Sequence, residues 1–214
     1  MRGGCVALAA PALLAGSAAA DLVTLDRWDA SLNFGVLADG GGAPMPLQGP
    51  EAMSLGAHVR TWQRVDGVAQ ASAWAQYEWS IDESPAGLGV SLILNTSAWA
   101  QVGQNPTYPA SRAIAEVFVD EAVFEVVVNE AVLLRVSGAS LGGYAPGVHT
   151  LAPGQHTLGL LGPLARASVD VGGEQSASDA SSLAFSFEIV AVPGPATSGV
   201  LAVIAWLARR RRAI

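Results

Sequence analysis

The first residues in this chain that could do chemistry are Gly138-Ala139-Ser140-Leu141-Gly142, which match a serine-nucleophile pattern. In enzymes that use Gly-x-Ser-x-Gly, the serine lies between a strand and a helix, and a carboxylate and then a histidine follow it in the chain. Here Gly143-Tyr144-Ala145-Pro146-Gly147 follows, which cannot begin a helix, and His149 and His156 both precede Asp170. The segment therefore predicts a glycine-rich loop between strands and no catalytic residue.

Three histidines, His58, His149 and His156, are the candidate ligands for a transition metal. If Pro153 and Gly154 form the centre of a two-residue turn, His149 and His156 lie on different rungs of one hairpin. A zinc site needs side chains that converge on one point. We therefore expect no metal site at these residues.

Two acidic pairs, Asp82-Glu83 and Asp120-Glu121, are typical of solvated loops or strand edges. Neither belongs to the 12-residue calcium loop of an EF-hand. Carboxylates that hydrolyse glycosides meet only in the fold, so an unrecognised hydrolase stays open as an alternative. The sequence favours a protein that is not an enzyme and has no cofactor, with a structural calcium ion as an open alternative.

The tryptophans are the remaining candidates for function. Five lie between the two ends of the chain: Trp28, Trp62, Trp74, Trp79 and Trp99. Most are expected in the core, because burying such a ring is worth a few kcal/mol. Trp74 differs, since it shares the even-numbered face of its strand with Ser72, Gln76 and Glu78. A flat ring among polar groups is typical of a platform on which a sugar stacks, and the alternative is that Trp74 is interior or covered by a loop.

The elements that must position these residues are strands. Alternation with a period of two predicts a half-buried strand at Ala73 to Asp82, where the odd positions are apolar. Similar segments are Val90 to Asn95, Ala113 to Asp120, Val123 to Val128, Ala131 to Ser137, His156 to Leu161, Ala165 to Val171 and Leu183 to Val190. Many short strands without a convincing helix predict an all-β domain, an antiparallel β-sandwich of jelly-roll-like type.

Two segments are less regular. Ala38 to Pro50 is rich in glycine and proline and predicts a long surface loop, and Glu174 to Ser182 predicts a loop or the flank of an edge strand. Neither divides the chain, so we expect one domain over residues 21–191.

The N-terminus has the parts of a signal peptide, which we expect to be helical and to span residues 1–20. Arg2 precedes an apolar run from Val6 to Leu14, and Ala18-Ala19-Ala20 offers the small residues that signal peptidase cuts after. The mature protein would then begin at Asp21. Cys5 leaves with the signal, so no disulfide or thiolate chemistry remains.

Charge also restricts the partners of the mature domain. All 18 acidic residues lie from Asp21 to Glu188, with only six arginines, which is an excess of twelve negative charges. Such a domain repels nucleic acid and anionic lipid.

The C-terminal segment, residues 192–214, combines a short motif, an apolar run and a basic cluster. Val192-Pro193-Gly194-Pro195 precedes a 13-residue run from Ala196 to Ala208, and Arg209, Arg210, Arg211 and Arg212 follow. As a helix the run is about 20 Å long, short for a bilayer core of roughly 30 Å. The arginines would stay on the cytoplasmic side, so the run acts as a stop signal with the domain outside.

This order of parts resembles the C-terminal sorting signal of PEP-CTERM proteins, which bacteria that make extracellular polysaccharide export. The family's core motif is Val-Pro-Glu-Pro, and here Gly194 stands in place of the glutamate. The resemblance covers about a tenth of the chain. It implies transient association with the inner membrane and processing by an exosortase, a membrane protease-transpeptidase.

We therefore expect an exported structural or adhesive protein of the cell surface or extracellular polysaccharide matrix. The first alternative is a carbohydrate-binding module that acts through exposed aromatic residues, with Trp74 as its glycan contact. The second is a hydrolase.

Overall fold

The computed structural model describes residues 21–42, 46–104 and 106–193, apart from the side chains of 161–163. These residues form ten strands and no helix. The strands are β1 (Val23–Asp39), β2 (Leu47–Ala52), β3 (Gly56–Asp66), β4 (Ala69–Ser84), β5 (Gly87–Val102), β6 (Arg112–Val128), β7 (Val132–Ser137), β8 (Gly147–Leu151), β9 (Gly154–Gly172) and β10 (Gln175–Ala191). The signal helix and the C-terminal helix that we expect lie outside the described residues.

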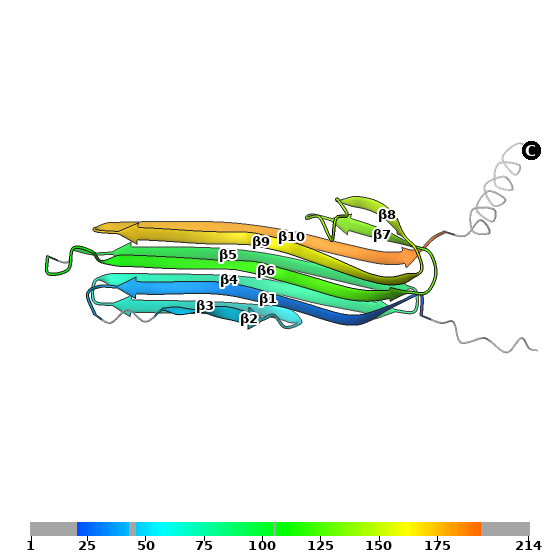
Figure 1. The fold of residues 1–214 in the computed structure, drawn as a ribbon, viewed down its shortest axis with the longest axis horizontal. Coiled ribbons are helices and arrows are strands. Elements are labelled where there is room, and N and C mark those ends of the chain that lie inside the picture. The colour runs from blue at the N-terminus through cyan, green and yellow to red at the C-terminus, as the bar shows by residue number, and fades with distance from the viewer. Residues whose placement is uncertain (1–20, 43–45, 105, 194–214) are drawn as a thin grey trace, which may run out of the picture.

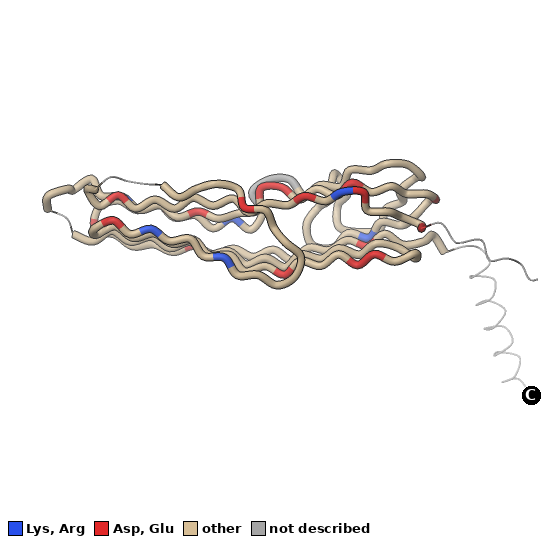
Figure 2. The backbone as a smooth tube through the Cα atoms, turned by 90° about the horizontal axis from the view of Figure 1, so that it is seen from below, with Lys and Arg blue, Asp and Glu red and all other residues tan. Residues whose placement is uncertain are grey.

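The strands form two antiparallel sheets, here called sheet A and sheet B. Sheet A has the order β2-β1-β6-β9, and sheet B has the order β3-β4-β5-β10-β7-β8. The sheets pack face to face, so that β9 contacts β10 and β5, β6 contacts β5 and β4, and β1 contacts β4 and β3 (Figure 1). Seen from the edge where β2 and β3 lie, the backbone shows two layers (Figure 2). The predicted all-β class with two antiparallel layers is confirmed.

Alternation along each strand produces the core between the layers. In β4 the odd positions from Ala69 to Trp79 are buried, while the even positions face away from sheet A. β5 follows the same rule with its even positions, including Leu92 and Leu94. The buried apolar residues of the described chain run from Val23 to Ile189 and form one cluster, so this segment contains its own core.

Aromatic rings fill one end of this core. Trp79 lies 5.4 Å from Trp28 and 5.8 Å from Phe124, measured between ring centroids. Phe124 in turn meets Phe187 edge to face at 5.1 Å. Such tilted and edge-on pairs add to the stability that burial alone provides.

Several predicted boundaries were wrong. The first two residues of the expected loop at Ala38 to Pro50 belong to β1 and its last four to β2, and the tract Glu174 to Ser182 lies almost wholly within β10. β2 is an edge strand that places Leu47, Gly49 and Glu51 on its inner face, and one apolar side chain among three is too weak a pattern to recognise.

Bulges explain a second set of errors. The segments predicted on either side of Asp120 and Glu121 form the single strand β6, whose register shifts there. β9 likewise joins two predicted segments, and its bulge holds Ala165 at a φ of 46°. An extra residue reverses the alternation, so a period-two reading ends a strand where a bulge only bends it.

Three further interactions define the ends and the edge of the sandwich. The described chain begins and ends at one end, because Asn129 N donates a hydrogen bond to the Leu22 carbonyl and Val132 pairs with Ala191 (Figure 1). Along the edge, Arg60 of β3 forms an ion pair with Glu51 of β2 at 2.5 Å, which joins sheet B to sheet A. The 17 residues of β6 make the sandwich about 55 Å long.

In the part of the chain that the structure describes, no helix has the length and apolar character to cross a membrane.

Candidate functional site: the outer face of sheet B

Trp74 lies on the outer face of sheet B, as the alternation of β4 predicts. Its neighbours across the strands are Thr61 of β3 and Ser97 of β5. The side chain is half-buried, and among the described residues its indole has neither a hydrogen-bond partner nor a ring contact. The ring is therefore available to a partner outside the domain.

Trp99 is a second tryptophan on this face, where the sequence singled out Trp74 alone. Trp99 pairs with Ser72 of β4, one two-residue step along the strands from the pair of Trp74 and Ser97. The two tryptophans are thus diagonal neighbours, with Cα atoms about 7 to 8 Å apart. The signal was present, because Asn95, Ser97 and Gln101 put polar residues on the same side of β5 as Trp99.

Around these rings, the neighbouring strands β3, β4, β5 and β10 each place four side chains on the outer face, and paired residues form four rows across the strands. We call its sixteen residues the tryptophan face: Val59, Thr61, Gln63 and Val65 of β3; Gln70, Ser72, Trp74 and Gln76 of β4; Asn95, Ser97, Trp99 and Gln101 of β5; and Ser176, Ser178, Ala180 and Ser182 of β10. From standard strand spacings the grid measures roughly 14 Å by 20 Å. It is broad because three neighbouring strand pairs stay in register along it.

The tryptophan face contains no charged residue. This is unusual in a segment with 18 acidic residues and six arginines. Charges on the outer face of β4 begin one rung further on, at Glu78, and continue at Asp82 toward the end where the chain begins and ends. The grid is therefore an uncharged surface on an acidic protein. Charged residues are widely spaced along both layers of the backbone (Figure 2).

The chemistry of this surface suits a neutral, hydroxyl-rich partner. Amides and hydroxyls both donate and accept hydrogen bonds, and flat indole rings cover the apolar faces of a partner. A partner that docks here removes no charge of the protein from water, so the large desolvation cost of buried charge does not arise.

The histidines do not come together. His58 Nε2 lies 2.9 Å from the Leu55 carbonyl, His149 Nε2 lies 2.7 Å from the Ala145 carbonyl, and each of these rings can donate to its own loop. The hairpin assumed for His149 and His156 was wrong, because β8 pairs with β7 in sheet B while β9 pairs with β6 in sheet A. His156 Nε2 lies 2.8 Å from a third carbonyl, that of Ala152.

Ser140 lies in a loop, as its glycine-rich surroundings predict. The next residues make a tight turn, in which the backbone N–H groups of Leu141 and Tyr144 each donate to the other's carbonyl at 2.8 Å. Strand β8 follows, so no helix begins behind the serine.

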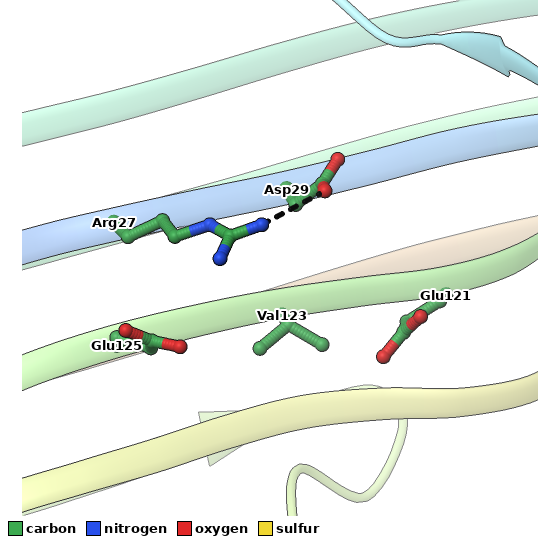
Figure 3. A pocket seen from close by; sticks show the side chains of 5 residues that line it. All are labelled: Arg27, Asp29, Glu121, Val123 and Glu125. Carbon is green, nitrogen blue, oxygen red and sulfur yellow. Dashed lines mark ion pairs between the residues drawn. The ribbon is translucent and has the colours of Figure 1, made fainter.

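The acidic residues of sheet A line a shallow hollow of about 210 Å³ on its outer face. Figure 3 shows Arg27 directed along β1 toward Asp29, with which it forms an ion pair at 3.5 Å, while Glu121 and Glu125 lie on β6 on either side of Val123. Within the described residues, no three histidine, cysteine or acidic side chains gather closely enough to hold a metal ion. The structural calcium ion of the sequence analysis therefore has no assigned ligands.

Of the processing residues, only Val192 and Pro193 belong to the described chain, where both are exposed directly after β10. Ala20, Gly194, Pro195 and the arginines at 209–212 lie outside it. Comparison of the chain with models of protein families, with curated proteins and with solved structures gives no match. The PEP-CTERM resemblance therefore stays a prediction.

Proposed function

We propose that this chain is an exported structural or adhesive protein of the cell surface or extracellular matrix, and that it adheres to polysaccharide through the tryptophan face. The observation that carries the proposal is the pair Trp74 and Trp99, which are half-buried, lie diagonally to each other and make no ring contact within the described residues, in an uncharged grid on an acidic domain. The proposal thus combines the expected adhesive role with the carbohydrate-binding alternative, since the protein would adhere by binding polysaccharide.

The position of the chain ends supports display at a surface. The signal peptidase site after Ala20 and the sorting motif at Val192 would both lie at one end of a sandwich about 55 Å long. Trp74 lies ten residues before Ser84, in the half of β4 that is farther from the chain ends. A domain held by its C-terminal tail would therefore present the tryptophan face away from the membrane, and an exosortase would reach Val192 without unfolding a strand.

A jelly-roll-like topology is part of the same proposal. Five of the nine connections between described strands pass from one sheet to the other, which supports it. The consecutive strands β3, β4 and β5 instead form a meander within sheet B, a local departure from two Greek keys.

The test uses the fragment Asp21–Ala191, which contains the whole described core. Affinity electrophoresis in gels containing hydroxyethylcellulose, galactomannan or xylan measures binding as retarded migration. We expect retardation of the unaltered fragment in at least one gel, its loss on Trp74→Ala and on Trp99→Ala, and no change on Val148→Ala. Val148 is an exposed apolar residue of β8 outside the tryptophan face, so it controls for loss of apolar surface.

Stability measurements accompany the binding assay. If Trp74→Ala lowers the free energy of unfolding as much as Trp79→Ala does, Trp74 is a core residue and the proposal fails. Retardation that survives both surface substitutions also excludes the tryptophan face. Intrinsic fluorescence gives a direct readout, because sugar stacked on an indole shifts its emission and protects it from small quenchers.

A further inference from the structure

The outer face of sheet A carries a second hollow, on the opposite side of the sandwich from the tryptophan face. Its volume is about 290 Å³, and it is lined by Asn33, Phe34, Gly35, Gln48, Gly49, Glu116 and Phe118. The lining comes from three adjacent strands, because Asn33 pairs with Phe118 and Gly35 pairs with both Glu116 and Gln48. The hollow is thus built by the register of β2, β1 and β6.

Gly35 is the residue that leaves this space open. A Cβ atom added to Gly35 would meet no atom within 4 Å, and its φ lies outside the left-handed region. The backbone therefore does not require glycine at this position. Glycine inside a strand is unfavourable, since it has no side chain to pack, and it often marks a place where a ligand approaches closely.

The side chains around Gly35 have complementary chemistry. Phe118 supplies an apolar ring, and the Arg166 guanidinium lies 5.8 Å from its centroid. Arg166 Nη2 also lies 2.5 Å from Oε1 of the half-buried Glu116, an ion pair that lacks the geometry of a hydrogen bond. The amides of Asn33 and Gln48 add donors and acceptors at the rim.

An apolar ring beside amides and a neutralised carboxylate matches a pyranose ring, which has apolar C–H faces and an equatorial rim of hydroxyls. The Arg166 and Glu116 charges cancel, so the site has no net charge with which to attract an acidic sugar. We propose that the Gly35 hollow binds a unit of a neutral polysaccharide, and that the sandwich cross-links two polysaccharide chains, one on each sheet.

Binding at the hollow is independent of the tryptophan face, whereas cross-linking rests on the proposed function as well. The two sheets of a sandwich lie about 10 Å apart, with their outer faces directed away from each other. A single polysaccharide chain would have to bend around the edge of the sandwich to occupy both sites, whereas two separate chains can each bind one face. A protein with two opposed sites turns weak single contacts into a network by multivalency.

The key variant is Gly35→Val, which fills the hollow. Because the position has open space and an ordinary φ, valine should leave the melting temperature unchanged or raise it. Ser31→Val on the same strand adds a comparable side chain outside the hollow and is the matched control. Phe118→Ala removes the apolar ring and provides a second, independent variant.

Binding is measured by isothermal titration of the Asp21–Ala191 fragment with cellohexaose, mannohexaose and xylohexaose. We expect two oligosaccharides per unaltered molecule for at least one of the three, and one per molecule after Gly35→Val or after Trp74→Ala combined with Trp99→Ala. Ser31→Val should keep two. A stoichiometry that Gly35→Val and Phe118→Ala leave unchanged overturns the hollow as a site, and so does the absence of binding to all three sugars.

Light scattering by mixtures with hydroxyethylcellulose, galactomannan or xylan reports cross-linking. The unaltered fragment should raise the scattering several-fold. Gly35→Val, or Trp74→Ala combined with Trp99→Ala, should abolish this rise while binding at the remaining site persists. Loss of binding only with the tryptophan variants refutes the hollow alone, and loss only with Gly35→Val refutes the tryptophan face alone. Equal scattering with polygalacturonate, an acidic polymer, contradicts the preference for neutral chains.

Discussion

The Thr96 hydroxyl of β5 donates a hydrogen bond to the Ala165 carbonyl of β9, 2.5 Å away, and so joins the two sheets through the core. Thr96 is one of few buried polar residues in the described chain, and the Ser181 carbonyl of β10 lies 3.3 Å from the same hydroxyl. Ala165 has a φ of 46°, a left-handed conformation that its side chain disfavours. The bond therefore fixes β9 at the bulge where its backbone departs most from a regular strand.

Thr96→Val should destabilise the domain by about 1 to 3 kcal/mol, because the Ala165 carbonyl then stays buried without its donor. Valine keeps the shape and strand preference of threonine, so the change isolates the hydroxyl. Urea denaturation followed by fluorescence measures the effect. Ser97→Val, one residue away on the outer face, should change stability by less than about 0.5 kcal/mol, and equal values for the two variants would show that the buried bond adds nothing.

Phe187→Ala should cost roughly 3 to 5 kcal/mol, because it opens a cavity in the aromatic end of the core. Phe187 is 1% exposed and lies 5.1 Å from Phe124 and 6.0 Å from Phe185, measured between ring centroids. Glu188→Ala, on the opposite face of β10, should cost less than about 1 kcal/mol, since its partner Arg135 lies 3.5 Å away in an exposed ion pair. Thermal and urea denaturation of both variants check the contrast, and a small loss from Phe187→Ala would mean that this end of the core is not closely packed.

Alternation was enough to place single faces of single strands. Phe185, Phe187 and Ile189 are alternate residues of the predicted strand Leu183 to Val190 and are buried together, and Trp74 lies on the face opposite to Trp79. These predictions depend only on the local rule that neighbouring side chains point to opposite sides of a strand. The same rule, extended along β5, would have placed Trp99 as well.

Pairing between distant strands could not be predicted in this way. The tryptophan face needs β10 beside β5, and the Gly35 hollow needs β6 beside β1. Both pairings join residues at least 73 positions apart in the chain, as in Asp39 with Arg112 and Val102 with Gln175. Periodicity carries no information about which strands meet or in which register. The same limit explains His149 and His156, which are neighbours along the chain but belong to different sheets.

The ion pair of Arg112 and Asp170 should make a small, pH-dependent contribution to stability. Arg112 Nε donates to Asp170 Oδ1 at 2.8 Å and Nη2 to Oδ2, and these bonds lower the pKa of Asp170 although its partial burial opposes them. A carboxyl whose pKa is lowered by folding stabilises the protein above its unfolded pKa of about 3.9, and loses that contribution as the pH falls through the folded value.

Arg112→Gln should therefore raise the pKa of Asp170 toward its ordinary value. NMR titration of the side-chain carboxyl carbon measures this shift directly. The stability difference between the two proteins should be small at pH 7, because both side chains are more than half exposed, and it should vanish as the pH falls through the lowered pKa of Asp170 in the folded protein. An unchanged titration of Asp170 in the variant would show that the pair does not persist in solution.

The last prediction concerns how the C-terminal segment is retained and processed during export. In a bacterium that has an exosortase, the apolar run Ala196 to Ala208 and the arginines behind it should hold the precursor at the inner membrane with the domain outside. Processing should then remove everything beyond the Val192 to Thr197 segment, because its two prolines disfavour a helix and should leave it accessible to a protease at the membrane surface. Replacing Arg209 to Arg212 by glutamine should weaken retention and misroute the protein, because the positive charges no longer oppose passage of the tail.

Ser198→Ala is the control and should change little, since it leaves the run apolar. Intact-mass spectrometry of protein recovered from the cell surface and medium determines both ends together: a chain from Asp21 to this segment supports export and sorting despite Gly194, and a chain that still ends at Ile214 refutes sorting and leaves a plain membrane anchor.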